Sequence, residues 1–261
     1  MAAGWEPLLG PFTWPVSLRM AAVTGIGAGQ RVLDVGCGPG DPTLQVAVLV
    51  GPHGRVVGID VAAEMLEAGR ARAAALGLGH VEFRQADVMT APLEAEGYDV
   101  VLGRSSVIYL ADPVAALARL QQALAPGGRI AITGWAPPEA NPWIELPRRA
   151  IARVRNLPPV DVAAPGPFAL SGDGELARAL LAAGFQAVQQ ERVQLSLFAR
   201  DAPEFWALTM DDAGPLAPLL APLSAGERQQ ATREVGEAVG RFRGPEGLRI
   251  PGQAQLAWGR A

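Results

Sequence analysis

The feature that most constrains this chain is a regular alternation, between residues 30 and 134, of short apolar runs and longer helical stretches. Runs rich in valine and isoleucine predict strands at 31–35, 55–59, 81–84, 99–102 and 129–133. The stretches between them predict helices at 42–50, 62–76 and 112–124. Strands that alternate with helices form βαβ units, so the pattern predicts a parallel sheet covered by helices.

Beyond residue 134 the pattern changes. Residues 136–167 contain eight prolines, which predicts a loop or cap with a short helix near 144–155. The remaining expected elements are a helix at 171–183, a strand at 186–197, helices over 203–243 with a break at 214–222, and a strand at 248–258. Ser224 and Glu227 have the spacing of a capping box that begins a helix.

Composition excludes several classes of function. The 22 basic residues are all arginine and are outnumbered by 26 acidic residues, so the chain lacks the cationic field that nucleic acid requires, and a mechanism that uses a lysine is excluded. One cysteine and two histidines exclude an intrachain disulfide and the common zinc sites, and we expect no metal. No apolar run reaches the roughly 18 residues of a membrane span. A cytoplasmic protein is expected.

The most distinctive local motif is VLDVGCGPGDPT at 32–43, a strand followed by Gly36, Gly38 and Gly40 and then by the start of a helix. Glycines at these positions permit a tight turn and let a ligand approach the backbone, and the helix N-terminus offers N–H groups. Taken alone, the motif is also compatible with a structural turn between a strand and a helix.

Acidic residues stand at or near the ends of three successive strands, at Asp34, Asp60 and Asp87. Asp60 follows Gly40 by twenty residues, where a carboxylate can bind both hydroxyls of a ribose. The alternative for Asp60 is an N-cap of the next helix, and for Asp87 a solvated turn. A glycine turn with one acid also suits a nicotinamide oxidoreductase, but that function explains neither Asp87 nor the Pro126–Gly128 turn.

With these motifs the sequence resembles the class I S-adenosylmethionine-dependent methyltransferases. The resemblance continues through GYDVVLGRSSVIYLADP at 97–113 and LQQALAPGGRIAITGW at 120–135, so four motifs occur in order over about 105 residues. It implies a Rossmann-like, doubly wound α/β sheet of seven strands, mostly parallel with an antiparallel last strand, and helical cap insertions. Within the family, the sequence is most similar to the ubiquinone/menaquinone biosynthesis type, which acts on small molecules.

The resemblance assigns roles at the cofactor site. It implies that Gly36, Gly38 and Gly40 shape the loop around the methionine portion of S-adenosylmethionine, with Asp34 at the head of that loop. It further implies that Asp60 binds the ribose, that Asp87 and Val88 hold the adenine, and that Arg104 lies beside the reacting centre. Arg104 is equally compatible with a substrate contact and with a surface charge.

A general base is harder to assign. His53 and His80 both precede strands, which places them at the amino-terminal edge of the sheet, whereas ligands bind at the carboxyl-terminal edge. The candidates for a proton acceptor are therefore Tyr109, Asp211 and Asp212, and for the two acids a solvated helix face is the alternative. Arg104 and its neighbours lack both the Pro-Pro-aromatic turn of amino-directed DNA methyltransferases and the Asp of metal-dependent catechol methyltransferases.

We therefore expect one methyltransferase domain over 1–261, with an N-terminal helical lid at 1–29, a cofactor-binding core at 30–135, and cap segments at 136–170 and 200–246 over the acceptor. The expected reaction is O- or C-methylation of a small, largely apolar acceptor, of the kind found in secondary metabolism. Alternatives are a lyase or cyclase that binds the cofactor without transferring methyl, and an interaction module. A homodimer is compatible with the sequence. Aromatic residues outside the core support an apolar acceptor: Trp5, Phe12, Trp14, Tyr109, Trp135, Trp143, Phe205 and Trp206.

Overall fold

The computed structural model describes residues 2–209 and 216–261. The chain forms two compact units. Unit 1 comprises Met1–Thr13, Ala136–Asp161 and Gln194–Gln253, and unit 2 comprises Trp14–Trp135, Val162–Val193 and Ala254–Ala261. Within the described ranges, no helix has both the length and the apolar character needed to cross a membrane.

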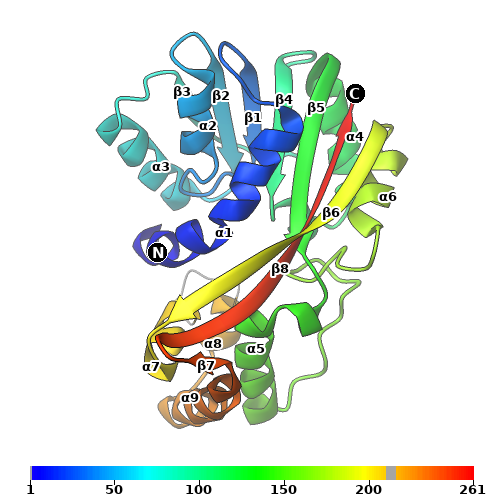
Figure 1. Cartoon of the computed structure of the whole chain (residues 1–261). Helices are drawn as coiled ribbons and strands as arrows, with labels where there is room; N and C mark the ends of the chain where they lie inside the picture. The colour runs from blue at the N-terminus through cyan, green and yellow to red at the C-terminus, as the bar shows by residue number, and fades with distance from the viewer. Residues whose placement is uncertain (1, 210–215) are drawn as a thin grey trace. The chain divides into compact units, whose positions relative to one another are not determined.

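Unit 2 is built on a parallel sheet (Figure 1). Its five parallel strands are β1 (Arg31–Val35), β2 (Arg55–Asp60), β3 (Val81–Gln85), β4 (Tyr98–Arg104) and β5 (Leu124–Trp135). Two long strands, β6 (Gln186–Ala199) and β8 (Gly247–Arg260), extend the sheet in the order β3-β2-β1-β4-β5-β8-β6. Residues 254–260 of β8 pair antiparallel with 129–135 of β5. The predicted Rossmann-like fold is confirmed, with one addition: the two-residue strand β7 (Arg243–Gly244) pairs with β8.

The helices that alternate with these strands also match the sequence pattern. They are α2 (Thr43–Val50), α3 (Ala63–Ala75) and α4 (Pro113–Ala123), and a 3-10 turn, η1 (Val107–Tyr109), follows β4. Before β1 lies α1 (Ala2–Thr24). The helix expected at 171–183 is shorter than predicted: α6 spans Glu175–Ala182, because Gly174 adopts a left-handed conformation with φ 73°.

Close packing of α3 on the sheet depends on a glycine. A β-carbon at Gly69 would lie 2.7 Å from the ring of Phe83 on β3, so only a residue without a side chain lets the helix approach this strand so closely. Leu66, Ala73 and Phe83 are buried in the same apolar cluster. The glycine's cost in helix propensity, about 1 kcal/mol, is offset by this contact.

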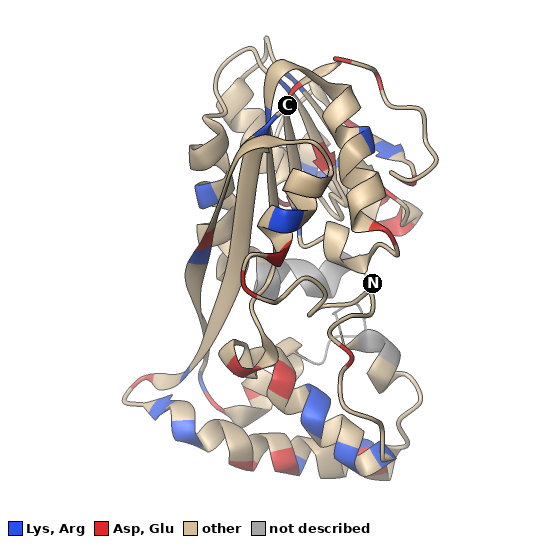
Figure 2. Cartoon of the chain, turned by 90° about the vertical axis from the view of Figure 1, so that its right-hand side faces the viewer, with Lys and Arg blue, Asp and Glu red and all other residues tan. Residues whose placement is uncertain are grey.

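Unit 1 contains the helices of the proline-rich and late segments. They are η2 (Pro138–Ala140), α5 (Pro142–Arg155), α7 (Ala202–Thr209), α8 (Ala217–Leu220), α9 (Ala225–Val239) and η3 (Gly240–Phe242). The capping box of Ser224 and Glu227 is confirmed at the start of α9. The helices of unit 1 carry charged residues of both signs (Figure 2). Arg153 on α5 pairs with Glu234 on α9 at 3.8 Å, and Arg155 pairs with Glu227 at 3.9 Å.

A fully buried asparagine organises the interior of unit 1. The Asn141 side-chain N–H group donates to the carbonyl of Ala136 at 2.8 Å and to that of Gln253 at 3.0 Å. Its carbonyl oxygen accepts from the indole N–H of Trp143 at 3.1 Å and from the Gln253 N–H at 2.9 Å. Phe12 packs edge-on against Trp143, with 5.1 Å between the ring centroids. One side chain thus joins segments 112 residues apart.

Candidate functional site

The parallel strands of unit 2 bring the predicted acidic residues to one edge of the sheet. In the register of the strands, Asp34 of β1 lies opposite Gly58 of β2, and Asp60 lies opposite Gln85 at the end of β3. Asp87 follows β3 by two residues, and Arg104 is the last residue of β4. All of these positions stand at or near the carboxyl ends of their strands, where open α/β sheets bind ligands.

Asp34 is a buried carboxylate with one unused oxygen. It is 1 % exposed, and its Oδ2 accepts a hydrogen bond of 2.6 Å from the hydroxyl of Thr43 at the start of α2. Its Oδ1 is buried and has no hydrogen-bond partner among the described residues. Burial raises the pKa of Asp34 to about 7, although the Thr43 hydroxyl and the charge of Arg104 oppose this shift. A donor or a cation at Oδ1 would satisfy this oxygen.

The glycine loop after β1 has the backbone conformation that the motif predicts. Gly36, Gly38 and Gly40 have φ values of 68°, 53° and 106°. A β-carbon at Gly36 would lie 2.4 Å from the β-carbon of Ser106, whereas Gly38 has open space around the same position. The loop therefore packs tightly against the segment after β4 and leaves its middle accessible to a ligand.

Asp60 holds this loop in place. Its Oδ2 accepts a hydrogen bond of 2.9 Å from the Gly38 N–H, and its Oδ1 accepts one of 2.9 Å from the Ala62 N–H. The N-cap of α3 is Ala62, which makes no side-chain cap bond, so Asp60 is not the N-cap residue. Each oxygen of a carboxylate can accept a second hydrogen bond, and two hydroxyl groups on adjacent carbons would fit the pair.

Asp87 is exposed and Val88 is buried next to it. The Oδ1 of Asp87 accepts a hydrogen bond of 2.8 Å from the Met89 N–H, which fixes the turn after β3. The Val88 carbonyl accepts one of 2.8 Å from the Nε of Arg119 on α4. The carboxylate of the exposed Asp87 keeps capacity to accept a further hydrogen bond, whereas the side chain of Val88 is only 5 % exposed.

Arg104 is not a free surface charge, because its guanidinium is held against the glycine loop. Its Nη2 donates to the carbonyl of Asp41 at 2.8 Å, and its Nη1 donates to the hydroxyl of Ser17 on α1 at 3.4 Å. Burial lowers the pKa of Arg104, and Asp41 and Asp34 oppose that shift. Its guanidinium therefore contacts the far end of the glycine loop at Asp41, and its charge acts on Asp34 at the head of the loop.

Sequence reasoning missed the residues that anchor the far end of this loop. Arg72 on α3 donates to the carbonyl of Pro39 at 2.7 Å and pairs with the buried carboxylate of Asp41 at 3.3 Å. Thr43 and Ser106 were also missed, and the hydroxyl oxygen of Ser106 is a second buried polar atom with no hydrogen-bond partner in the described part of the chain. Thr43 is the last residue of the motif at 32–43 and Ser106 lies within the motif at 97–113, whereas Arg72 belongs to no motif and local sequence offers no signal for its contacts.

The proposed proton acceptors receive less support. Tyr109 ends η1 and is 47 % exposed, but desolvation of its hydroxyl raises its pKa to about 12. At neutral pH the hydroxyl therefore donates a hydrogen bond more readily than it accepts a proton. Asp211 and Asp212 lie outside the described residues.

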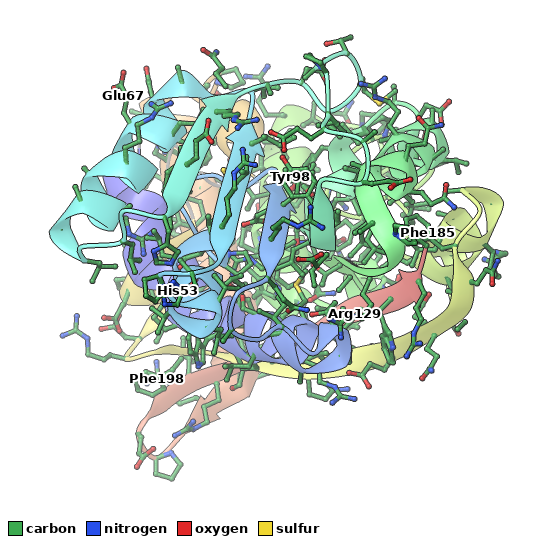
Figure 3. The ribbon with its side chains drawn as sticks, turned by 90° about the horizontal axis from the view of Figure 1, so that it is seen from above. His53, Glu67, Tyr98, Arg129, Phe185 and Phe198 are labelled. Atoms are coloured by element: carbon green, nitrogen blue, oxygen red, sulfur yellow. The ribbon has the colours of Figure 1, made fainter. Side chains whose placement is uncertain are left out.

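The two histidines lie at the opposite edge of the sheet, as predicted. His53 precedes β2 and His80 precedes β3, and His80 Nε2 lies 2.9 Å from the Ala47 carbonyl oxygen. Figure 3 looks onto this amino-terminal edge and labels His53. In the ranges that the structure describes, no cluster of histidine, cysteine and acidic residues has an arrangement that could hold a metal ion.

Most of the aromatic residues outside the core of the sheet pack in the interior. The buried ones are Phe12, Trp135, Trp143 and Phe205. Trp14 and Tyr109 are 41 % and 47 % exposed, and Trp206 is half-buried. The side chain of Trp5 lies outside the described part of the structure. Packing therefore accounts for most of the aromatic residues taken to indicate an apolar acceptor.

The sheet order, the glycine loop and the acidic carboxyl edge together define an α/β protein that binds a nucleoside-containing cofactor. Comparison with known proteins makes the class specific. Residues 26–153 match the family model described as "Methyltransferase domain". The nocamycin O-methyltransferase of Saccharothrix syringae is 36 % identical over 258 residues, which cover 89 % of this chain and 92 % of that protein. The chain belongs to the S-adenosylmethionine-dependent methyltransferases.

Other relatives match a smaller part of the chain. The aklanonic acid methyltransferase DauC of a Streptomyces strain is 39 % identical over 142 residues, or 51 % of this chain and 64 % of that protein. The ubiquinone/menaquinone biosynthesis C-methyltransferase UbiE of Pseudomonas syringae is 38 % identical over 120 residues, or 44 % of this chain and 46 % of that protein. The predicted resemblance to this group is confirmed.

Solved structures confirm the fold. The YcgJ protein of Bacillus subtilis superposes with a TM-score of 0.61 at 20 % identity, covering 94 % of this chain and 97 % of that one. The [4+2]-cyclase SpnF superposes with a TM-score of 0.57 at 22 % identity, covering 94 % of this chain and 80 % of that one.

The residues of the site fit S-adenosylmethionine. Among the buried polar atoms that have no hydrogen-bond partner within the described residues, Asp34 Oδ1 and Ser106 Oγ flank the glycine loop, and the open space at Gly38 would admit a ligand against the backbone. Asp60 has acceptor capacity for a ribose. Together these features provide donors and acceptors along the length of a nucleoside with an amino-acid tail.

Proposed function

We propose that this methyltransferase acts on a small, largely apolar acceptor and that the methylated atom is oxygen. The observation that carries this proposal is the likeness to an O-methyltransferase over 89 % of the chain and 92 % of that relative. The likeness to a C-methyltransferase spans only 44 % of the chain, so carbon is the second choice. Two relatives named for nocamycin and aklanonic acid favour an acceptor of secondary metabolism.

The proposed division of labour follows the contacts at the carboxyl edge. Gly36, Gly38 and Gly40 surround the methionine portion of S-adenosylmethionine and Asp60 binds its ribose, while Asp87 and Val88 hold the adenine. When bound, S-adenosylmethionine supplies a methyl group that is already activated for displacement. The chain's own residues then align the acceptor and exclude water.

Arg104 and Asp34 set the charge around the head of the loop. The guanidinium of Arg104 fixes the loop through the Asp41 carbonyl and balances the charge of Asp34. The buried Asp34 oxygen offers an acceptor for an ammonium group. In this proposal both residues orient the cofactor, and neither takes a proton from the acceptor.

The acceptor's proton has no assigned base. The raised pKa of Tyr109 suits a hydrogen-bond donor to the acceptor oxygen. Asp211 and Asp212 stay candidates for a proton acceptor. We propose that residues 136–170 and 200–246, which have no specific motif, determine which acceptor is used.

Methyl transfer can be tested with S-adenosylmethionine labelled with carbon-13 in the methyl group. The enzyme is incubated with a panel of phenols, aromatic carboxylic acids and 1,3-diketones, and the products are analysed by mass spectrometry. We expect a labelled methyl ether or ester together with an equal amount of S-adenosylhomocysteine. An acceptor that is converted without S-adenosylhomocysteine would instead support a lyase or cyclase, and label on carbon would contradict the choice of oxygen.

A further inference from the structure

The amino-terminal edge of the sheet in unit 2 carries a polar cavity that the cofactor site does not use. Its volume is about 310 Å³, and it is lined by Gln30, Asp99, Arg129, Arg260 and residues 125–128 at the start of β5. The strands run from this edge toward Asp34 and Asp60, so the cavity lies one strand length from the proposed cofactor site. Figure 3 looks onto this edge and labels Arg129.

Two arginines of this cavity face each other across a pair of strands. Arg129 of β5 and Arg260 of β8 are direct partners in the antiparallel register, so both side chains leave the same face of the sheet. Like charges directly opposite each other on neighbouring strands destabilise a sheet. Within residues 2–209 and 216–261, neither guanidinium has a carboxylate at ion-pair distance.

The one acidic residue in the lining is already neutralised. Asp99 accepts from the backbone N–H of Arg31 at 2.8 Å, and from its guanidinium at 2.7 Å on Oδ1 and 3.3 Å on Oδ2. This pairing lowers the pKa of Asp99, with a smaller contribution from Arg129. Both oxygens of Asp99 are committed to Arg31, and Arg129 and Arg260 keep an excess of positive charge.

Glycines shape the position of Arg129. A β-carbon at Gly25, just after α1, would lie 2.9 Å from Nη1 of Arg129, so the guanidinium lies against the backbone there. Gly25 has a φ of 57° and Gly127, near the start of β5, has a φ of 73°, and both conformations favour glycine. The N–H of Ala261 donates to the Gly128 carbonyl at 2.9 Å, which fixes the end of β8 beside the start of β5.

We propose that Arg129 and Arg260 bind a small oxyanion of the phosphate class at this edge. A guanidinium presents a planar pair of donors that matches two phosphate oxygens, and two guanidiniums on neighbouring strands can share one anion. The cavity of about 310 Å³ is large enough for a phosphate group and a small organic substituent. The proposal does not depend on the methyl acceptor or on the cofactor site.

Inorganic phosphate, titrated at constant ionic strength with chloride as the compensating ion, tests this site. Calorimetry and thermal unfolding should show binding to the wild type, and Arg129→Gln and Arg260→Gln should each weaken it at least tenfold. Arg178→Gln is the matched control, because it removes an exposed arginine of the same unit and should leave phosphate binding unchanged. S-adenosylhomocysteine binding should be the same in all four proteins.

Three further measurements test the site. In low salt without phosphate, Arg260→Gln should unfold at the same temperature as the wild type or higher, because it removes the opposed charge. A chain extended by two glycines after Ala261 should bind phosphate at least as tightly as the wild type does. Tighter binding of ribose 5-phosphate would identify a phosphate monoester as the ligand, and tighter binding of phosphate would identify the free ion. An equal response in wild type and both glutamine variants would mean an adventitious ion only and would overturn the proposal.

Discussion

At the scale of single residues, the glycine loop is held in place by contacts with side chains from other elements. Gly36 lies against Ser106, and Asp60 fixes the middle of the loop through the Gly38 N–H. Thr43 and Arg104 hold its two ends through Asp34 and Asp41. Side chains from β2, β4, α2 and the segment after β4 therefore hold the loop and the residues that flank it.

Gly36→Ala should abolish cofactor binding while the chain still folds. The added methyl group would lie 2.4 Å from the Ser106 β-carbon, at a φ of 68° that an alanine rarely adopts, so the loop must move away from β4. Gly27→Ala is the control, since a β-carbon there has open space. Circular dichroism checks the fold, and calorimetry with S-adenosylhomocysteine should show at least a tenfold loss for Gly36→Ala and none for Gly27→Ala.

The buried Asp34 should make stability depend on pH. Because its pKa rises from 3.8 to about 7 on folding, the native protein holds a proton that the unfolded chain releases. This contribution is fully present below about pH 4 and is lost as pH rises through about 7. In urea titrations, the free energy of unfolding of the wild type should therefore fall, relative to that of Asp34→Asn, as pH rises between these two values.

A second variant separates this effect from other carboxylates. Thr43→Val removes the hydroxyl that donates to the ionised form of Asp34, so the loss should extend to higher pH. If the difference in unfolding free energy between wild type and Asp34→Asn stayed constant from pH 4 to 8, the raised pKa of Asp34 would be contradicted.

At the scale of elements, α9 shows how a local sequence signal sets a boundary. The Ser224 hydroxyl accepts from the Glu227 N–H at 3.3 Å, and the Glu227 carboxylate accepts from the Ser224 N–H at 2.8 Å. Ala231, Val235 and Val239, each four residues apart, are then buried on one side of the helix, whereas Phe242 beyond the helix is only half-buried.

Ser224→Ala should destabilise the protein by about 1 kcal/mol, the usual effect of losing an N-cap hydroxyl. Ser224→Asp keeps an acceptor at the same position and should retain most of the stability. The midpoint of urea unfolding measures both variants. Equal destabilisation by alanine and aspartate would show that the cap bond is not the cause.

The elements of the sheet could be predicted because their pattern is local. β1 begins and ends at the expected residues, and the other core strands differ mainly at their ends. The site was partly predictable, since Asp60 and the three glycines belong to short motifs. The contacts of Arg72 and Ser106 with this loop, and of Ser17 with Arg104, were not predictable, because each joins elements that are distant in sequence.

At the scale of the whole molecule, the chain combines two compact units with different sequence character. Unit 2 contains every motif that identifies the family, and unit 1 contains most of the proline-rich and late helical segments. Methyl transfer requires little chemistry from the protein beyond alignment, so a fixed cofactor site can be combined with acceptor-specific segments. The position of the motifs within unit 2 is consistent with this division.

Asn141→Ala should destabilise unit 1 without changing the cofactor site. It leaves the buried N–H of Trp143 and the carbonyls of Ala136 and Gln253 with one partner fewer each, at a cost of roughly 2–3 kcal/mol. Hydrogen exchange should increase at 136–161 and 225–253. Binding of S-adenosylhomocysteine should stay within twofold of the wild type, and a larger loss would show that the two units do not behave separately.

The chain is expected to bind S-adenosylmethionine at the glycine loop through Asp60. Calorimetric titration of S-adenosylhomocysteine into wild type, Asp60→Asn and the exposed control Glu67→Gln tests it most directly. We expect one site per chain in the wild type and in Glu67→Gln, and affinity at least tenfold weaker in Asp60→Asn, the loss expected for a charged pair of hydrogen bonds. Absence of binding to the wild type at hundreds of micromolar, or equal affinity in all three proteins, would contradict the claim.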